Sequence, residues 1–199
     1  MLKLKIAMYS MTMVFFLGTI VFAQKKCMFI GATPGKGGKI SENADYDKHI
    51  MLLIKEWGYT IDKKHNCQDL PNYTEANYEP YDFIFLSESI HSSQVSPLRN
   101  IRKPMLSVEA MCSKHSALGF ADSDRAASYL DPGKPVVFLD AAKDHPLAAG
   151  YAPGDVVEFG VYAKKKCLMT WATPTIPVIS IAGIQGNQER LAVFGVEKG

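Results

Sequence analysis

The sequence lacks the features that mark nucleic-acid-binding and redox proteins. Its 22 Lys and Arg residues are nearly balanced by 20 Asp and Glu residues, whereas nucleic-acid-binding domains carry clustered positive charge. The cysteines form no C-x-x-C pair, which excludes a thioredoxin-type redox site. Internal repeats and low-complexity segments are also missing. We therefore expect a single ordinary globular domain with no nucleic-acid partner.

The four cysteines leave the redox state open. In an oxidising compartment they allow up to two disulfide bridges, in any of three connectivities. Buried free thiols are also common, and Cys27 and Cys167 stand at the heads of apolar runs where they occur. The residues concerned are Cys27, Cys67, Cys112 and Cys167.

A long apolar run occurs only at the start of the chain. Lys3 and Lys5 precede an apolar stretch from Ile6 to Phe22, and Ala23 follows it. This pattern is typical of a secretory signal peptide over residues 1–23. We expect a secreted or periplasmic protein whose mature part, 24–199, has no stable membrane span. The alternative is an uncleaved anchor, for which a run of about 17 residues is short.

The first half of the mature chain predicts a parallel sheet. Its strands are short continuous apolar runs, as expected for strands buried on both faces. A helix over 45–57 has Ile50, Leu53, Ile54 and Trp57 at the spacing of one apolar face. Residues 63–80 show no clear periodicity and predict a loop. The expected strands are Met28–Gly31, Tyr59–Asp62, Asp82–Ser87 and a run from Pro104, with a short helix from Ser96 to Ile101 before the last.

The second half predicts short antiparallel hairpins added to this core. The strand-like runs are closely spaced and separated by turn residues. The fold class is therefore α/β, with a flavodoxin-like three-layer core, a mostly parallel sheet and appended antiparallel strands near the C-terminus. The expected strands are 135–139, 156–162, 167–172, 177–181 and 191–196.

Polar residues follow two of the predicted parallel strands directly. Ser87, Glu88 and Ser89 come after one strand, and Glu109 comes after the next. Ligands of open parallel sheets bind outside the carboxyl ends of the strands. Two hydroxyls and two carboxylates suit a polyol, because paired acceptors can chelate vicinal hydroxyl groups. These four residues are the predicted ligand-binding site.

Other chemistries fit the sequence less well. The glycine-rich loop from Gly31 to Gly38 does not have Walker spacing, and Gly37 stands where that motif needs Ser or Thr. We therefore predict no nucleotide cofactor. Glu88, His91, Cys112 and His115 offer ligands for zinc, and Cys112 with His115 offers a nucleophile and base. Both remain weaker alternatives, and the predicted site contains no metal.

The segment Lys103-Pro-Met-Leu-Ser-Val-Glu109-Ala-Met111 resembles the class I glutamine amidotransferase-like superfamily, especially its secreted ThuA-like relatives. The resemblance covers most of 26–199. Three further segments fit the same pattern: Glu56-Trp-Gly58-Tyr59, Tyr81–Ser89 and Asp144–Gly150.

In active amidotransferases the corresponding strand leads into a Gly-x-Cys-x-Gly elbow that carries the nucleophile. Here Glu109 stands at the cysteine position, with Ser107 and Met111 at the glycine positions. No histidine follows Ile181, so the His-Pro-Glu partner is missing as well. The resemblance therefore implies a member that is not a functional glutamine amidotransferase. The family continues for another strand, which implies a C-terminal truncation or a sheet that ends early.

These expectations combine into one functional hypothesis. The chain is an exported, non-catalytic amidotransferase-like domain that binds a small polar, carbohydrate-like ligand through Ser87, Glu88, Ser89 and Glu109. The carbohydrate class rests partly on the resemblance. The alternative is a hydrolase or isomerase with Glu88 and Glu109 as acid and base. A scaffold role is a third hypothesis, and the oligomeric state is open.

Overall fold

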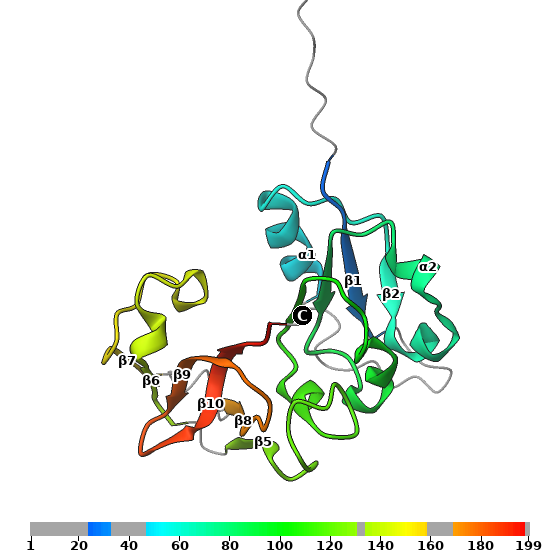
Figure 1. The fold of residues 1–199 in the computed structure, drawn as a ribbon. Coiled ribbons are helices and arrows are strands. Elements are labelled where there is room, and N and C mark those ends of the chain that lie inside the picture. Colours follow the sequence, from blue (N-terminus) through cyan, green and yellow to red (C-terminus); the bar gives the residue numbers. More distant parts are fainter. Residues whose placement is uncertain (1–23, 33–46, 131–133, 159–168, 198–199) are drawn as a thin grey trace, which may run out of the picture.

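The computed structural model describes residues 24–32, 47–130, 134–158 and 169–197, whose strands form two sheets (Figure 1). One sheet has four parallel strands in the order β2-β1-β3-β4. The other has six strands in the order β5-β8-β10-β9-β6-β7, with every pair antiparallel. The predicted α/β class, with parallel strands first and antiparallel strands later, is confirmed at this level. The predicted signal peptide lies outside the described residues.

The parallel sheet is built from strands that bury alternating side chains on its two faces. Cys27, Phe29 and Phe85 belong to one apolar cluster, and residues one position away, such as Met28 and Ile84, belong to another. This alternation follows from the two-residue period of a strand. The strands are β1 (Cys27–Gly31), β2 (Lys64–Asn66), β3 (Phe83–Leu86) and β4 (Met105–Ser107).

Different elements cover the two faces of this sheet. Helix α1 (Asp47–Glu56) packs on one face through Ile54, which is fully buried, with Ile50 and Met51 beside it. The other face is covered by shorter helices and their connections. The buried side chains come from the 3₁₀ helices η2 (Cys67–Asn72) and η4 (Ser96–Leu98) and from the short helix α2 (Glu75–Tyr78). The 3₁₀ helix η3 (Ser92–Gln94), which buries no side chain, precedes η4.

Two predictions about this half are wrong. Leu53 and Trp57, predicted on the buried face of the helix, are 39% and 50% exposed. The second strand was predicted at Tyr59–Asp62, where the structure has only an isolated parallel bridge between Lys26 and Thr60. The real strand β2 lies in the predicted loop. Its residues Lys64, His65 and Asn66 are polar, so no apolar run marks it.

The antiparallel sheet contains one strand that the sequence did not predict, β5 (Ala127–Leu130). Strands β9 (Ile179–Ile184) and β10 (Asn187–Gly195) form a hairpin, with Gly186 at a φ of 82° in its turn. Their apolar face packs with that of β6 to form a separate core. The remaining strands are β6 (Val136–Phe138), β7 (Val156–Val157) and β8 (Met169–Ala172).

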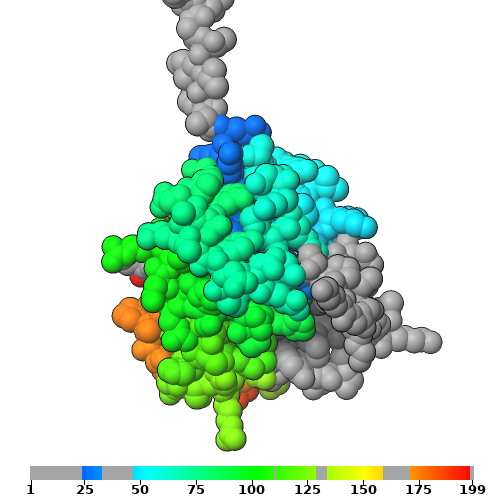
Figure 2. Space-filling view, turned by 90° about the vertical axis from the view of Figure 1, so that its right-hand side faces the viewer, coloured from blue at the N-terminus to red at the C-terminus, as the bar shows by residue number. Residues whose placement is uncertain are grey.

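The two sheets are joined by the chain that follows β4. The 3₁₀ helix η5 (Ala110–Ser113) packs against β5 and β8. The ring of Phe120 meets that of Phe194 edge-to-face, with centroids 6.4 Å apart. In the space-filling view, residues from β2 to β5 form one continuous teal and green surface (Figure 2). The 3₁₀ helices η6 (Asp140–Ala142) and η7 (Pro146–Ala148) complete the described elements.

Of the two alternatives left open for the cysteines, the structure has buried free thiols at Cys27, Cys67 and Cys112. Cys167 lies outside the described residues. Within the described part of the chain, every helix is too short or too polar to cross a membrane.

Candidate functional site

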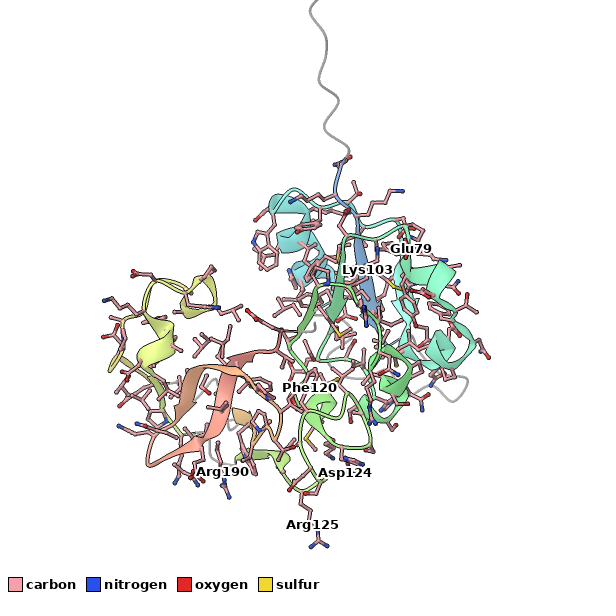
Figure 3. All side chains as sticks on the ribbon, viewed as in Figure 1. Glu79, Lys103, Phe120, Asp124, Arg125 and Arg190 are labelled. Atoms are coloured by element: carbon pink, nitrogen blue, oxygen red, sulfur yellow. The ribbon has the colours of Figure 1, made fainter. Side chains whose placement is uncertain are left out.

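The strand order of the parallel sheet creates a switch point between β1 and β3. The chain passes from β1 to β2 on one side, then returns to add β3 and β4 on the other. Ligand crevices of open α/β sheets lie at such a point, beyond the carboxyl ends of the strands. Glu79 and Lys103 precede β3 and β4 and lie at the amino edge, whereas Phe120 lies at the opposite end of this half (Figure 3).

A buried polar cluster occupies the switch point, with Asp47 at its centre. Asp47 is 2% exposed and begins the described part of α1. Its Oδ1 accepts a hydrogen bond from the Ser87 hydroxyl, and its Oδ2 accepts one from the Ser89 hydroxyl at 2.9 Å. Lys64 Nζ lies 2.7 Å from the same Oδ2 and supplies the neutralising charge. The cluster thus links α1, β2 and the end of β3.

The two serines are also held by backbone donors. Ala32 N donates to Ser89 Oγ at 2.9 Å, and Ser89 N donates to Ser87 Oγ at 3.1 Å. Each hydroxyl therefore donates one hydrogen bond to Asp47 and accepts one from the backbone. Ser87 and Ser89 are 3% and 2% exposed, so these predicted ligand-binding residues face the interior and support the chain on both sides of Glu88.

Gly31 allows this cluster to form against the end of β1. A Cβ at this position would lie 2.6 Å from Asp47 Oδ2 and 3.2 Å from Ser89 Oγ. Real Cβ atoms do not approach an oxygen so closely, so only glycine fits here without a shift of Asp47.

Glu88 and Glu109 follow adjacent parallel strands and are both accessible to solvent. Glu88 is exposed and Glu109 is half-buried. Val108 N donates to Leu86 O at 3.1 Å, so the two strand ends stay paired up to these residues. Glu109 Oε1 accepts a hydrogen bond from Met111 N at 2.8 Å and thereby caps η5.

The electrostatic environment of Glu109 links it to Glu88. Burial raises the pKa of Glu109, and the negative charge of Glu88 raises it further. The hydrogen bond from Met111 and the charge of Lys114 oppose this rise. A carboxyl group with a raised pKa retains its proton to higher pH, so it can donate as well as accept hydrogen bonds.

Sequence reasoning missed Asp47 and Lys64. Asp47 was included in the predicted helix, but no motif indicated that its carboxylate turns inward. Lys64 was assigned to a loop because β2 has no apolar run. Nothing in the sequence shows that Ser87 and Ser89 turn inward or selects one aspartate as their partner.

The alternative chemistries are not supported by the geometry. The Cys112 thiol is 1% exposed and burial raises its pKa to about 12, whereas His115 is exposed. A thiol that stays protonated at neutral pH is a poor nucleophile. In the part of the chain that the structure describes, no three His, Cys, Asp or Glu side chains come together as metal ligands.

A hollow of about 490 Å³ lies on the antiparallel sheet, away from all four predicted residues. It is formed by the end of β6, the start of η6 and Gly154, and its polar side chains are Asp140, Ser180 and Gln188. This hollow gives any test of the candidate site a defined competing location.

No protein-family model, no curated protein and no solved structure matches this chain. The amidotransferase-like resemblance therefore stays a prediction, and function has to be argued from the site itself.

Proposed function

We propose that the chain binds a small polar, carbohydrate-like ligand at the carboxyl edge of its parallel sheet, with Glu88 and Glu109 as its direct contacts. The observation that carries the proposal is the placement of these carboxylates on adjacent strand ends, both reachable by solvent and close enough for one charge to act on the other. In this proposal the chain is exported, flavodoxin-like in its core and unable to hydrolyse glutamine.

A polyol fits this arrangement better than an anion does. The two glutamates accept hydrogen bonds from hydroxyl groups, and a protonated Glu109 can also donate one. Lys64 lies close by, but its charge is already paired with Asp47. An anionic ligand would be repelled by both carboxylates, and the charge of Lys114, which lowers the pKa of Glu109, would offset part of that repulsion.

The Asp47 cluster supports the proposal by fixing the backbone around Glu88. Ser87 and Ser89 flank this glutamate and are both tied to one buried carboxylate. Such preorganisation reduces the entropy lost when a ligand is bound. Ser87 and Ser89 therefore act as positioning residues in this proposal.

Calorimetric titration with glucose, galactose, mannose and sorbitol tests the binding proposal. We expect heat of binding for at least one compound, and its loss in a Glu88→Gln, Glu109→Gln double variant. Glu79→Gln is the matched control, because Glu79 is exposed at the amino edge. Binding that survives the double variant would place the ligand elsewhere.

A hydrolase or isomerase is the second candidate, and the raised pKa of Glu109 favours it. Glu109 would act as the acid and Glu88 as the base. Turnover of the same compounds, or of their glycosides, should then fall by about 100-fold or more in Glu109→Gln, while binding is retained. Binding without turnover in the unaltered protein would leave the non-catalytic proposal.

A further inference from the structure

A second buried polar network lies next to the candidate site and is centred on His65, the middle residue of β2. His65 is 5% exposed. Its Nδ1 lies 3.0 Å from the Tyr73 hydroxyl oxygen, and its Nε2 lies 3.0 Å from that of Tyr81. The Tyr81 hydroxyl donates to Asp62 Oδ2 at 2.9 Å. These contacts tie β2 to the end of η2 and to the start of β3.

The direction of the last bond assigns the tautomer of the neutral ring. Tyr81 has a single hydroxyl proton, which Asp62 accepts, so its oxygen must accept the proton of His65 Nε2–H. A neutral imidazole carries one N–H, so Nδ1 is the acceptor for the Tyr73 hydroxyl. All the donors therefore point the same way, from Tyr73 through His65 and Tyr81 to Asp62.

The surroundings disfavour a second proton on this ring. Burial and the charge of Lys63 lower the pKa of His65, against the opposing charges of Asp62 and Asp69. Asp62 is 56% exposed and its nearer oxygen is 3.9 Å from Nε2. A proton on Nδ1 would meet the Tyr73 hydroxyl proton, so that hydrogen bond would have to reverse. Tyr78 packs against Tyr73 and adds no charge near neutral pH, because burial raises its pKa.

We infer that His65 is an acid-sensitive latch that controls the candidate site through its neighbour Lys64; this inference rests on the proposed function. Strand β2 has three residues and, among the strands that the structure describes, pairs with β1 alone. Lys64 and His65 are adjacent and point to opposite faces. Protonation of His65 reverses the Tyr73 bond, loosens β2 and withdraws Lys64 from Asp47. The buried Asp47 carboxylate then lacks its neutralising charge. The cluster that holds Ser87 and Ser89 on either side of Glu88 is weakened, and ligand binding falls in acid.

Long-range ¹⁵N NMR of the histidine rings in the purified protein tests the latch without any ligand. We expect the Nε2–H tautomer for His65 near neutral pH, and a titration midpoint below the ordinary value of 6.5. The Nδ1–H tautomer, or a midpoint at or above 6.5, would overturn the inference.

Affinity for the tightest-binding compound of the calorimetric panel tests the link to the site. Between about pH 7.5 and about pH 5.5, which bracket the ordinary histidine pKa, the unaltered protein should lose affinity by about threefold or more. His65→Gln, whose amide can donate to Tyr81, should lose clearly less, and His49→Gln on the exposed side of α1 should behave like the unaltered protein. Equal losses in all three would overturn the link.

The two proposals fail in different ways. Absence of binding at both pH values would reject the proposed function, while the ring tautomer and the urea midpoint as a function of pH still report on the latch. If His65→Gln does not fold, the ring titration of the unaltered protein and its loss of affinity in acid decide together.

Discussion

Glu88 differs from the serines on either side of it in the direction of its side chain. The hydroxyls of Ser87 and Ser89 turn inward to Asp47, whereas Glu88 is exposed. Because the side chains alternate in direction, Glu88 points to solvent while the serines before and after it fix the backbone. At the scale of single residues, the buried Asp47 is thus as important for the candidate site as the exposed glutamates.

Asp47→Asn should destabilise the protein by about 3 kcal/mol, because it leaves Lys64 without its partner and turns an amide N–H toward other donors. Urea unfolding at neutral pH measures the loss. Asp122→Asn, at an exposed position, serves as the control and should change stability by less than about 0.5 kcal/mol. An equally small loss in Asp47→Asn would show that the cluster does not hold the strand ends together.

The pKa of Glu109 should fall toward its ordinary value of 4.5 when Glu88 is replaced by Gln, because the negative charge of Glu88 is one cause of the raised pKa. Burial should keep it above that value. Carboxyl ¹³C NMR titration measures both proteins. An unchanged pKa in Glu88→Gln would mean that the two carboxylates are too far apart to share a ligand.

This raised pKa also sets a pH dependence of stability. A carboxyl group whose pKa is raised by folding contributes stability below its ordinary pKa, and that contribution is lost as the pH rises through the folded value. Replacing Glu109 by Gln should therefore flatten the dependence of the unfolding free energy on pH from pH 4.5, the ordinary pKa of glutamate, upward. Urea midpoints across this range report the difference, and parallel profiles would contradict it.

At the scale of elements, the packing of α1 shows how local pattern and tertiary structure diverge. The apolar spacing predicts a face that includes Leu53 and Trp57, but the four-stranded sheet covers only the side with Ile50 and Ile54. The spacing of apolar residues in the sequence shows only that a helix has an apolar side. It does not show how much of that side the neighbouring sheet is wide enough to bury.

The junction of β1 with α1 is tight enough to test by adding one methyl group. Gly31→Ala should cost about 1–3 kcal/mol, because the new Cβ would lie 2.6 Å from Asp47 Oδ2. Gly195→Ala is a matched control, since its Cβ would meet Leu147 and Ile179 at ordinary distances of 3.7 and 3.8 Å. Equal stabilities for the two variants would mean that the Asp47 cluster can move aside freely.

The sequence predicts those elements that carry their own signal. Strands β1, β3 and β4 are found because each is an apolar run, and the glutamates follow from the ends of β3 and β4. Strand β2 reads Lys-His-Asn and is fixed by contacts with residues distant in sequence: Asp47, Tyr73 and Tyr81. Such a strand exists because of its partners, so no local pattern indicates it, and Lys64 is missed with it.

At the scale of the whole molecule, the two sheets place the candidate site where they meet. Strand β1 runs toward the end of the parallel sheet that lies nearer the antiparallel sheet (Figure 1). Glu109 caps η5, which packs against β5 and β8. A ligand at the carboxyl edge would therefore lie near the junction.

Chemical-shift mapping of backbone amides during titration with the polyols shows where the ligand binds. We expect shifts concentrated at residues 87–89 and 107–112, at the ends of β3 and β4. Shifts confined to Asp140, Ser180 and Gln188 around the hollow of the antiparallel sheet, with none at Glu88 or Glu109, would contradict this expectation.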